Sequence, residues 1–160
     1  MRGDADVIKH LNKALTNELT AINQYWLHYR VLKNWGIAKL ADYERHESID
    51  EMKHADRLIK RILFLDGLPN LQDLGRLGIG ETVAECLNAD LQLESAARTD
   101  LVAAVARCEA EKDFASREIA VHILEDAEEH IDFLETEISL IEKVGEQNYL
   151  QTQIGEGKAN

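Results

Sequence analysis

A repeated pattern of glutamate and histidine restricts how this chain can fold. Adding 76 to positions 18, 51 and 54 gives 94, 127 and 130, and five of these six positions hold Glu18, Glu51, His54, Glu94 and His130. Residues three apart share one face of an α-helix. We therefore expect each half of the chain to form two helices whose carboxylate and imidazole groups point into a common interior.

Such a pattern is typical of a dinuclear metal site. Two carboxylates and two Glu-x-x-His pairs, distributed over four helices of a bundle, can bind two metal ions in the bundle core. Carboxylate and imidazole ligands suit iron or manganese. A single Glu-x-x-His would be weak evidence, since it usually marks a solvated face. Here the matched offset adds a second histidine, and each histidine has a glutamate at the same upstream distance, which is hard to obtain by chance. The sixth position holds Ala127, so this set lacks one carboxylate.

Composition limits the function further. The 160 residues include 30 acidic and 18 basic side chains, a formal net charge of −12. Nucleic-acid-binding proteins are typically basic, so we expect no nucleic-acid partner. The charge suits a surface that attracts cations, although it also simply keeps a helical protein soluble. Cys86 and Cys108 form no C-x-x-C pair and are expected to be reduced, partly buried thiols.

No targeting or membrane segment is expected. The first residues contain no apolar signal region. No apolar run approaches the roughly 18 residues that a membrane-spanning helix needs. We therefore expect no membrane partner and a cytoplasmic location.

The apolar residues recur at helical spacing in five segments. These span about residues 4–34, 39–64, 81–111, 113–144 and 147–154. Between the second and third lies a stretch from Leu65 to Gly80, which contains the only proline and four glycines among spaced leucines. It is too long for a tight turn and too apolar for a flexible linker, so we expect an ordered crossover. We predict one all-α domain over residues 1–160.

Local signals support the first and fourth helices. Asp4 or Asp6 can cap the first helix, and Gly36 is expected to end it in a left-handed conformation. Gly145 is expected to close the fourth helix. Glu18 falls inside the apolar stripe of the first helix, where a charge is costly unless something pairs with it.

Several segments carry specific residue orders rather than a general helical pattern. They are NEL at 17–19, AINQY at 21–25, HESIDEMKHAD at 46–56, LFL at 63–65, GLPNLQ at 67–72, HID at 130–132 and LE at 134–135. In these segments the chain resembles the bacterioferritins, the heme-carrying branch of the ferritin family, and the likeness extends over essentially its whole length. The resemblance implies a ferritin-like four-helix bundle, and a hollow shell of two dozen subunits that stores ferric mineral.

The resemblance also implies that ferrous iron is oxidised at a di-iron centre inside each subunit. By position, the ligands would be Glu18 and His54 for one iron, Glu94 and His130 for the other, and Glu51 as a bridge. The family has a second bridging glutamate where this chain has Ala127, so we expect weaker metal binding and impaired ferroxidase activity. Asp126, about 40° from the direction of His130 on the helix, is the only neighbour that could stand in for it. Alternatively, Asp126 simply faces the neighbouring surface.

Met52 follows Glu51 by one residue and therefore points about 100° away from it, out of the bundle. Methionine on a helix is usually core filler or contact surface. The resemblance implies instead that Met52 from each of two symmetry-related subunits ligates one heme b, because a thioether suits heme iron. The heme pocket would be lined by Leu19, Ile22, Asn23, Trp26 and Ile49.

Other polar residues have two interpretations each. His46 and Asp50 form either a surface ion pair or, by the resemblance, an iron site on the inner surface of the shell. Tyr25 is either an electron donor beside the di-iron centre or an ordinary core aromatic residue. The remaining histidines match no ligand spacing and are expected to be structural; they are His10, His28 and His122.

Two functions therefore remain open. The first is a homo-oligomeric iron-storage ferroxidase with a modified di-iron centre. The second is a heme-bearing subunit without ferroxidase activity, in a mixed shell with a second bacterioferritin subunit that oxidises the iron. In both, iron ions are the cargo, and a reductase or ferredoxin is expected to act in iron release. A di-iron oxygenase or a rubrerythrin-like peroxidase has less support, since the latter would need a C-x-x-C rubredoxin domain.

Overall fold

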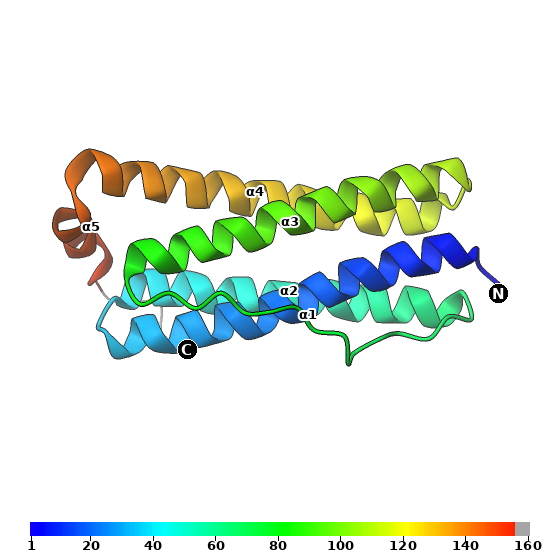
Figure 1. Ribbon diagram of the computed structural model, residues 1–160, viewed down its shortest axis with the longest axis horizontal. Coiled ribbons are helices and arrows are strands. Elements are labelled where there is room, and N and C mark those ends of the chain that lie inside the picture. Colours follow the sequence, from blue (N-terminus) through cyan, green and yellow to red (C-terminus); the bar gives the residue numbers. More distant parts are fainter. Residues whose placement is uncertain (156–160) are drawn as a thin grey trace.

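Four long helices lie side by side and a short fifth helix follows them (Figure 1). The structure is a computed structural model that describes residues 1–155. The helices are α1 (Ala5–Asn34), α2 (Ala38–Phe64), α3 (Val83–Ala110), α4 (Phe114–Val144) and α5 (Glu146–Gln153). The predicted all-α bundle with a long crossover and a short last helix is confirmed. The predicted domain range of 1–160 extends into residues 156–160, which lie outside the described part of the chain.

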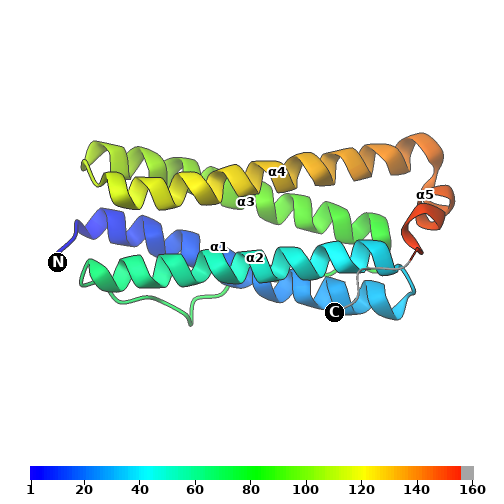
Figure 2. The same ribbon diagram turned by 180° about the vertical axis from the view of Figure 1, so that it is seen from behind.

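The helices form two antiparallel pairs, α1 with α2 and α3 with α4 (Figures 1 and 2). The two pairs stack so that α1 packs on α3 and α2 packs on α4. The crossover after α2 returns along the outside of the bundle beside α1, so α2 and α3 run in the same direction (Figure 1). Helix α5 lies at the end of the bundle and contacts α4 and α2. None of the described helices combines the length and the apolar composition needed to cross a membrane.

The helix ends follow the local sequence. Asp4 caps α1, where its Oδ1 accepts hydrogen bonds from two backbone N–H groups of the first turn. Gly36 and Gly145 have φ values of +81° and +83°, in the left-handed region that favours glycine. Helix α3 begins at Val83, two residues later than the sequence predicts. The reason is Thr82, whose hydroxyl oxygen caps the helix.

The crossover is held by a row of polar side chains on α1. Thr20, Gln24 and His28 stand four residues apart and so share one face of the helix. Each accepts a hydrogen bond of 2.8–3.1 Å from the backbone N–H of a crossover glycine. The donors are, in order, Gly75, Gly78 and Gly80. A Cβ atom at Gly80 would collide with the backbone of Cys86, so this close approach requires glycine.

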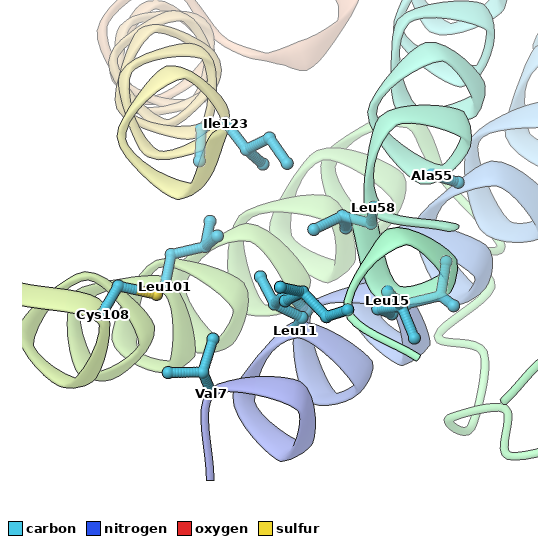
Figure 3. Packing of buried hydrophobic residues seen from close by; sticks show 12 residues of the cluster. Val7, Leu11, Leu15, Ala55, Leu58, Leu101, Cys108 and Ile123 are labelled. Carbon is cyan, nitrogen blue, oxygen red and sulfur yellow. The ribbon is translucent and has the colours of Figure 1, made fainter. Parts of the chain in front are cut away.

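The apolar core has two parts, one toward each end of the bundle. Figure 3 shows the first part, in which α1, α2, α3 and α4 all contribute side chains such as Leu11, Leu58, Leu101 and Ile123. The second part lies near α5 and includes Leu32, Leu40, Leu87, Leu134 and Tyr149. Both cysteines are fully buried, more deeply than expected, because a thiol packs as a small apolar group in the bundle interior.

A candidate metal centre in the bundle

Between the two apolar clusters, a layer of carboxylate and imidazole side chains crosses the bundle interior. Every long helix contributes to it. The five residues predicted from the repeated pattern are Glu18 of α1, Glu51 and His54 of α2, Glu94 of α3 and His130 of α4. Each is only 3–6 % exposed. Burying so many charged groups is costly unless they are paired with one another or with cations.

The first half of this layer is centred on His54. Its Nδ1 lies 3.5 Å from Glu18 Oε2 and 3.6 Å from Glu51 Oε2. Among the described atoms, His54 Nδ1 and Glu18 Oε2 are buried and have no hydrogen-bond partner. A buried donor or acceptor without a partner costs free energy, and a bound cation would remove that cost. These three side chains can together hold one metal ion.

The second half is centred on His130. Its Nδ1 lies 3.1 Å from Glu94 Oε1 and 3.4 Å from Glu47 Oε2. Glu47, Glu51 and His130 form a second group whose ligand atoms lie close enough to hold a metal ion. Glu51 thus belongs to both halves, as a bridging ligand would. Glu47 is not part of the repeated glutamate and histidine pattern. Its i, i+4 spacing from Glu51, which puts both side chains on one helix face, was the signal that could have singled it out.

Two tyrosines flank the imidazole of His130. The Tyr25 hydroxyl donates a hydrogen bond of 2.5 Å to Glu94 Oε1, and its ring lies edge-on to His130 at 5.2 Å between centroids. Burial and the charge of Glu94 raise the pKa of Tyr25 well above its usual value, so its phenol is protonated. Tyr43 lies 5.5 Å from the His130 ring and stacks on Phe133. The sequence pattern did not identify Tyr43.

Asp126 contacts the outer nitrogen of His54. Its Oδ2 accepts a hydrogen bond of 2.7 Å from Nε2, whereas Nδ1 faces Glu18 and Glu51. His122 lies 3.6 Å from the same carboxylate oxygen. A carboxylate behind a metal-binding histidine fixes the ring orientation and the tautomer. Asp126 therefore contacts His54 on the side of the ring opposite the buried carboxylates, where a hydrogen bond can orient the ring.

The charges of this layer shift its pKa values. Burial acts to lower the pKa of His54, but Glu51 and Asp126 raise it to about 9. Burial likewise acts to lower the pKa of His130, whereas Glu94 and the neighbouring glutamates raise it to about 9. At neutral pH both imidazoles therefore carry a proton that a metal ion must displace.

Binding of a divalent metal is consequently expected to strengthen as the pH rises. Between pH 6.5 and 8.5 the apparent affinity should increase by about tenfold per pH unit for each imidazolium proton displaced, and it should level off near pH 9. Calorimetric titration with Zn²⁺ in buffers of different ionisation enthalpy measures both the affinity and the protons released. An affinity that does not depend on pH over this range would contradict the expectation.

A second buried polar group lies one helical turn further along the bundle, and the sequence pattern missed it. His28, Glu44 and Asp90 are all fully buried. The Gly80 N–H donates to His28 Nε2, so His28 Nδ1 carries the proton and donates to Asp90 Oδ1 at 2.8 Å. Both ring nitrogens of His28 are therefore occupied by hydrogen bonds, which favours the structural role that the sequence predicts. Burial and nearby Asp90 raise the pKa of Glu44 well above its usual value, which makes it a neutral acid.

The candidate metal centre opens to the surface between α2 and α4. The opening has a volume of about 300 Å³. Its lining includes Tyr43, Glu47, Asp50, Asp126, Glu129 and Phe133. Most of these side chains are acidic, so the opening suits the entry of a cation.

His46 and Asp50 lie on the exposed side of α2. His46 Nδ1 donates a hydrogen bond of 2.8 Å to the backbone carbonyl of Asp42. Asp50 lies 3.8 Å from the ammonium group of Lys53. Within the described residues, the two side chains thus have partners other than each other.

A separate groove of about 400 Å³ surrounds Met52 on the outside of α1 and α2. Met52 is 57 % exposed, as its position one residue past Glu51 predicts. The groove is lined by Ile22, Asn23, Trp26, Leu27, Arg30, Ser48 and Met52. Leu19 and Ile49, which were also expected there, are not among the lining residues, and Leu19 packs against the apolar core. The sequence did not predict Leu27, Arg30 and Ser48 as lining residues, although positions 23, 26, 27 and 30 recur at helical spacing.

Comparison with known proteins gives a consistent result. The ferritin-like domain family matches residues 8–144. The chain is similar to the bacterioferritin of Brucella melitensis biotype 1, with 50 % identity over 151 residues that cover 94 % of each chain. The bacterioferritin of Rhodobacter capsulatus is 50 % identical over 149 residues, which cover 93 % of this chain and 92 % of the relative. Bacterioferritin BfrA of Mycobacterium tuberculosis is 48 % identical over 149 residues, which cover 93 % and 94 %.

Proposed function

This chain belongs to the bacterioferritin family, and we propose that it stores iron in a hollow shell of subunits after oxidising Fe(II) at the buried centre of each bundle. The observation that carries the proposal is the convergence of two potential metal-binding groups that share Glu51, with ligands from α1, α2 and α4 and with Glu94 of α3 hydrogen-bonded to His130. Hard carboxylate oxygens and imidazoles suit iron. The unpartnered, buried Glu18 Oε2 and His54 Nδ1 are consistent with a cation at this place.

Ferrous iron is the substrate, and the opening between α2 and α4 is its route of entry. On binding, the metal ions displace the protons of His54 and His130, which leave through the same opening. Glu51 holds both metal positions together, and Asp126 keeps the His54 ring oriented through Nε2. Dioxygen is the electron acceptor: two Fe(II) ions supply two electrons, which with two protons from water reduce it to hydrogen peroxide. The hydrogen bond from Tyr25 to Glu94 supports a role for Tyr25 as a further electron donor. His46 and Asp50 would take iron onward at the inner surface.

Ala127 limits the rate of this chemistry. It is buried, 5 % exposed, and its methyl group offers no metal ligand where a glutamate could bridge both ions. A bridging ligand fixes the metal–metal separation that joint reduction of oxygen requires. We therefore expect oxidation to proceed more slowly than in a centre with two bridging carboxylates.

The groove around Met52 supports heme b binding between two subunits. The exposed thioether of Met52 would hold the heme iron, and apolar side chains such as Trp26 and Leu27 would contact the heme. The heme would supply electron transfer during iron release, with a reductase or ferredoxin as the electron source.

A second candidate function rests on the combination of Ala127 and Met52. A subunit that keeps the heme ligand but lacks one bridging carboxylate could be the heme-bearing partner in a mixed shell. In that case a second bacterioferritin subunit would oxidise the iron, and this chain would contribute heme and the inner surface.

Iron retention tests the proposed function. Aerobic addition of Fe(II) to the metal-free assembly is expected to leave iron that co-elutes with protein on gel filtration, in amounts far above the capacity of a two-metal centre. Glu51→Gln, which removes the shared carboxylate, should slow the initial oxidation without changing the size of the assembly. Retention no greater than a two-metal centre can hold would contradict storage. Fast oxidation only after a second subunit type is added would favour the mixed shell.

A further inference from the structure

We propose that Glu47 is the fourth carboxylate ligand of the metal centre, and that it holds the second metal ion together with His130 and Glu94 in place of the ligand missing at position 127. This inference rests on the proposed function. It starts from the geometry around His130, whose Nδ1 lies 3.4 Å from Glu47 Oε2 and 3.1 Å from Glu94 Oε1. The ligand atoms of Glu47, Glu51 and His130 all lie within 4.8 Å of one another.

The angular position of Glu47 around the axis of α2 explains why its carboxylate can reach His130. At 100° per residue, Glu47 lies about 40° from Glu51 and about 20° from His54 around the helix axis. All three side chains therefore point from α2 toward the bundle interior. Along the axis, Glu47 is one turn before Glu51 and almost two turns before His54. This displacement brings its carboxylate to His130, at the far end of the centre from His54 and Glu18.

The charge of the centre also favours a fourth carboxylate. Two divalent ions carry a charge of +4, whereas Glu18, Glu51 and Glu94 together supply −3. The remaining positive charge would be held among side chains that are only 3–6 % exposed, which is unfavourable in a buried site. An ionised Glu47 brings the sum to zero. Its side chain is 19 % exposed at the opening, so it can join the metal at a smaller desolvation cost than a fully buried group.

Asp126 does not fill this role in the structure. Its carboxylate accepts a hydrogen bond from His54 Nε2, the ring nitrogen that faces away from Glu18 and Glu51. Glu47, in contrast, contacts the imidazole of His130, which has no carboxylate at position 127 as a neighbour. Because Glu47 faces His130 and not His54, it serves one metal position and does not replace a bridge. Metal binding at the second position is thus kept, while the coupling of the two positions is weakened.

Anaerobic titration of the metal-free assembly with Co²⁺ tests this assignment, with visible absorption and calorimetry as readouts. A His46→Ala background removes the exposed histidine as a competing ligand. The protein with native Glu47 is expected to bind two ions per subunit. Glu47→Gln should weaken the second ion at least about tenfold and leave the first unchanged. The matched control is Glu129→Gln, which removes the same charge from the lining of the same opening and should retain both ions.

A rescue variant separates a ligand role from a general effect on folding. Adding Ala127→Glu to Glu47→Gln is expected to restore the second ion, because a carboxylate then returns to His130 from α4. Equal binding of two ions by the native protein and by Glu47→Gln would overturn the assignment and leave the proposed function intact. Absence of bound metal in both the native protein and the Ala127→Glu variant would instead overturn the proposed function, and the assignment of Glu47 with it.

Discussion

Replacing Ala127 with glutamate is expected to raise the initial rate of Fe(II) oxidation by at least about tenfold, a gain comparable to the effect of ligand and outer-shell changes at other metal sites. Ala127 lies three residues before His130 on α4 and is buried, so a longer side chain there would point into the same layer. A glutamate would supply one oxygen to each metal ion. The two ions would then share a second bridge beside Glu51, as joint reduction of oxygen requires.

Stopped-flow absorbance after mixing the metal-free assembly with Fe(II) and oxygen measures this rate. Ala127→Gln is the matched control, because it adds nearly the same volume without the charge. It should remain close to the unmodified protein. If Ala127→Glu is no faster, or if Ala127→Gln is equally accelerated, the missing carboxylate does not limit oxidation. A fast phase already present in the unmodified protein would show that Glu47 supports oxidation as well as binding.

Met52→Leu is expected to abolish heme binding. Leucine preserves the apolar volume of the side chain, but it removes the only thioether in the groove, and heme iron has no other ligand of that kind there. Heme content, measured by the pyridine hemochrome after reconstitution, should fall from about one heme per two subunits to a background level. Thermal stability of the heme-free protein should not change, because Met52 is 57 % exposed in the subunit.

Met52→His provides the control for this experiment. Imidazole also ligates heme iron, so this variant should retain heme with a shifted visible spectrum. Unchanged heme content in Met52→Leu would remove Met52 from the site. Loss of heme in both variants, together with a loss of subunit pairing, would mean that position 52 acts through the contact between subunits.

Much of the fold was accessible from local patterns. Asp4, Gly36 and Gly145 mark helix ends through capping and backbone chemistry that depend only on neighbouring residues. The late start of α3 follows from the side chain of Thr82, which caps the helix, whereas the spacing of the apolar residues does not mark the capping residue. The crossover was recognised from its composition, but its docking on Thr20, Gln24 and His28 depends on how α1 is rotated in the bundle.

The same division holds for the metal centre. The spacing of Glu18, Glu51, His54, Glu94 and His130 predicted which side chains face the interior, since the angle between residues on one helix is constant. The sequence by itself thus determined the helices, the buried face of each and the absence of a carboxylate at position 127. Which residues of different helices meet depends on the axial shift and rotation of those helices, which are set by packing of the whole core. Only the tertiary structure therefore decided that Glu47 reaches His130, that Asp126 lies behind His54, and that His28 is tied to Asp90 and the crossover.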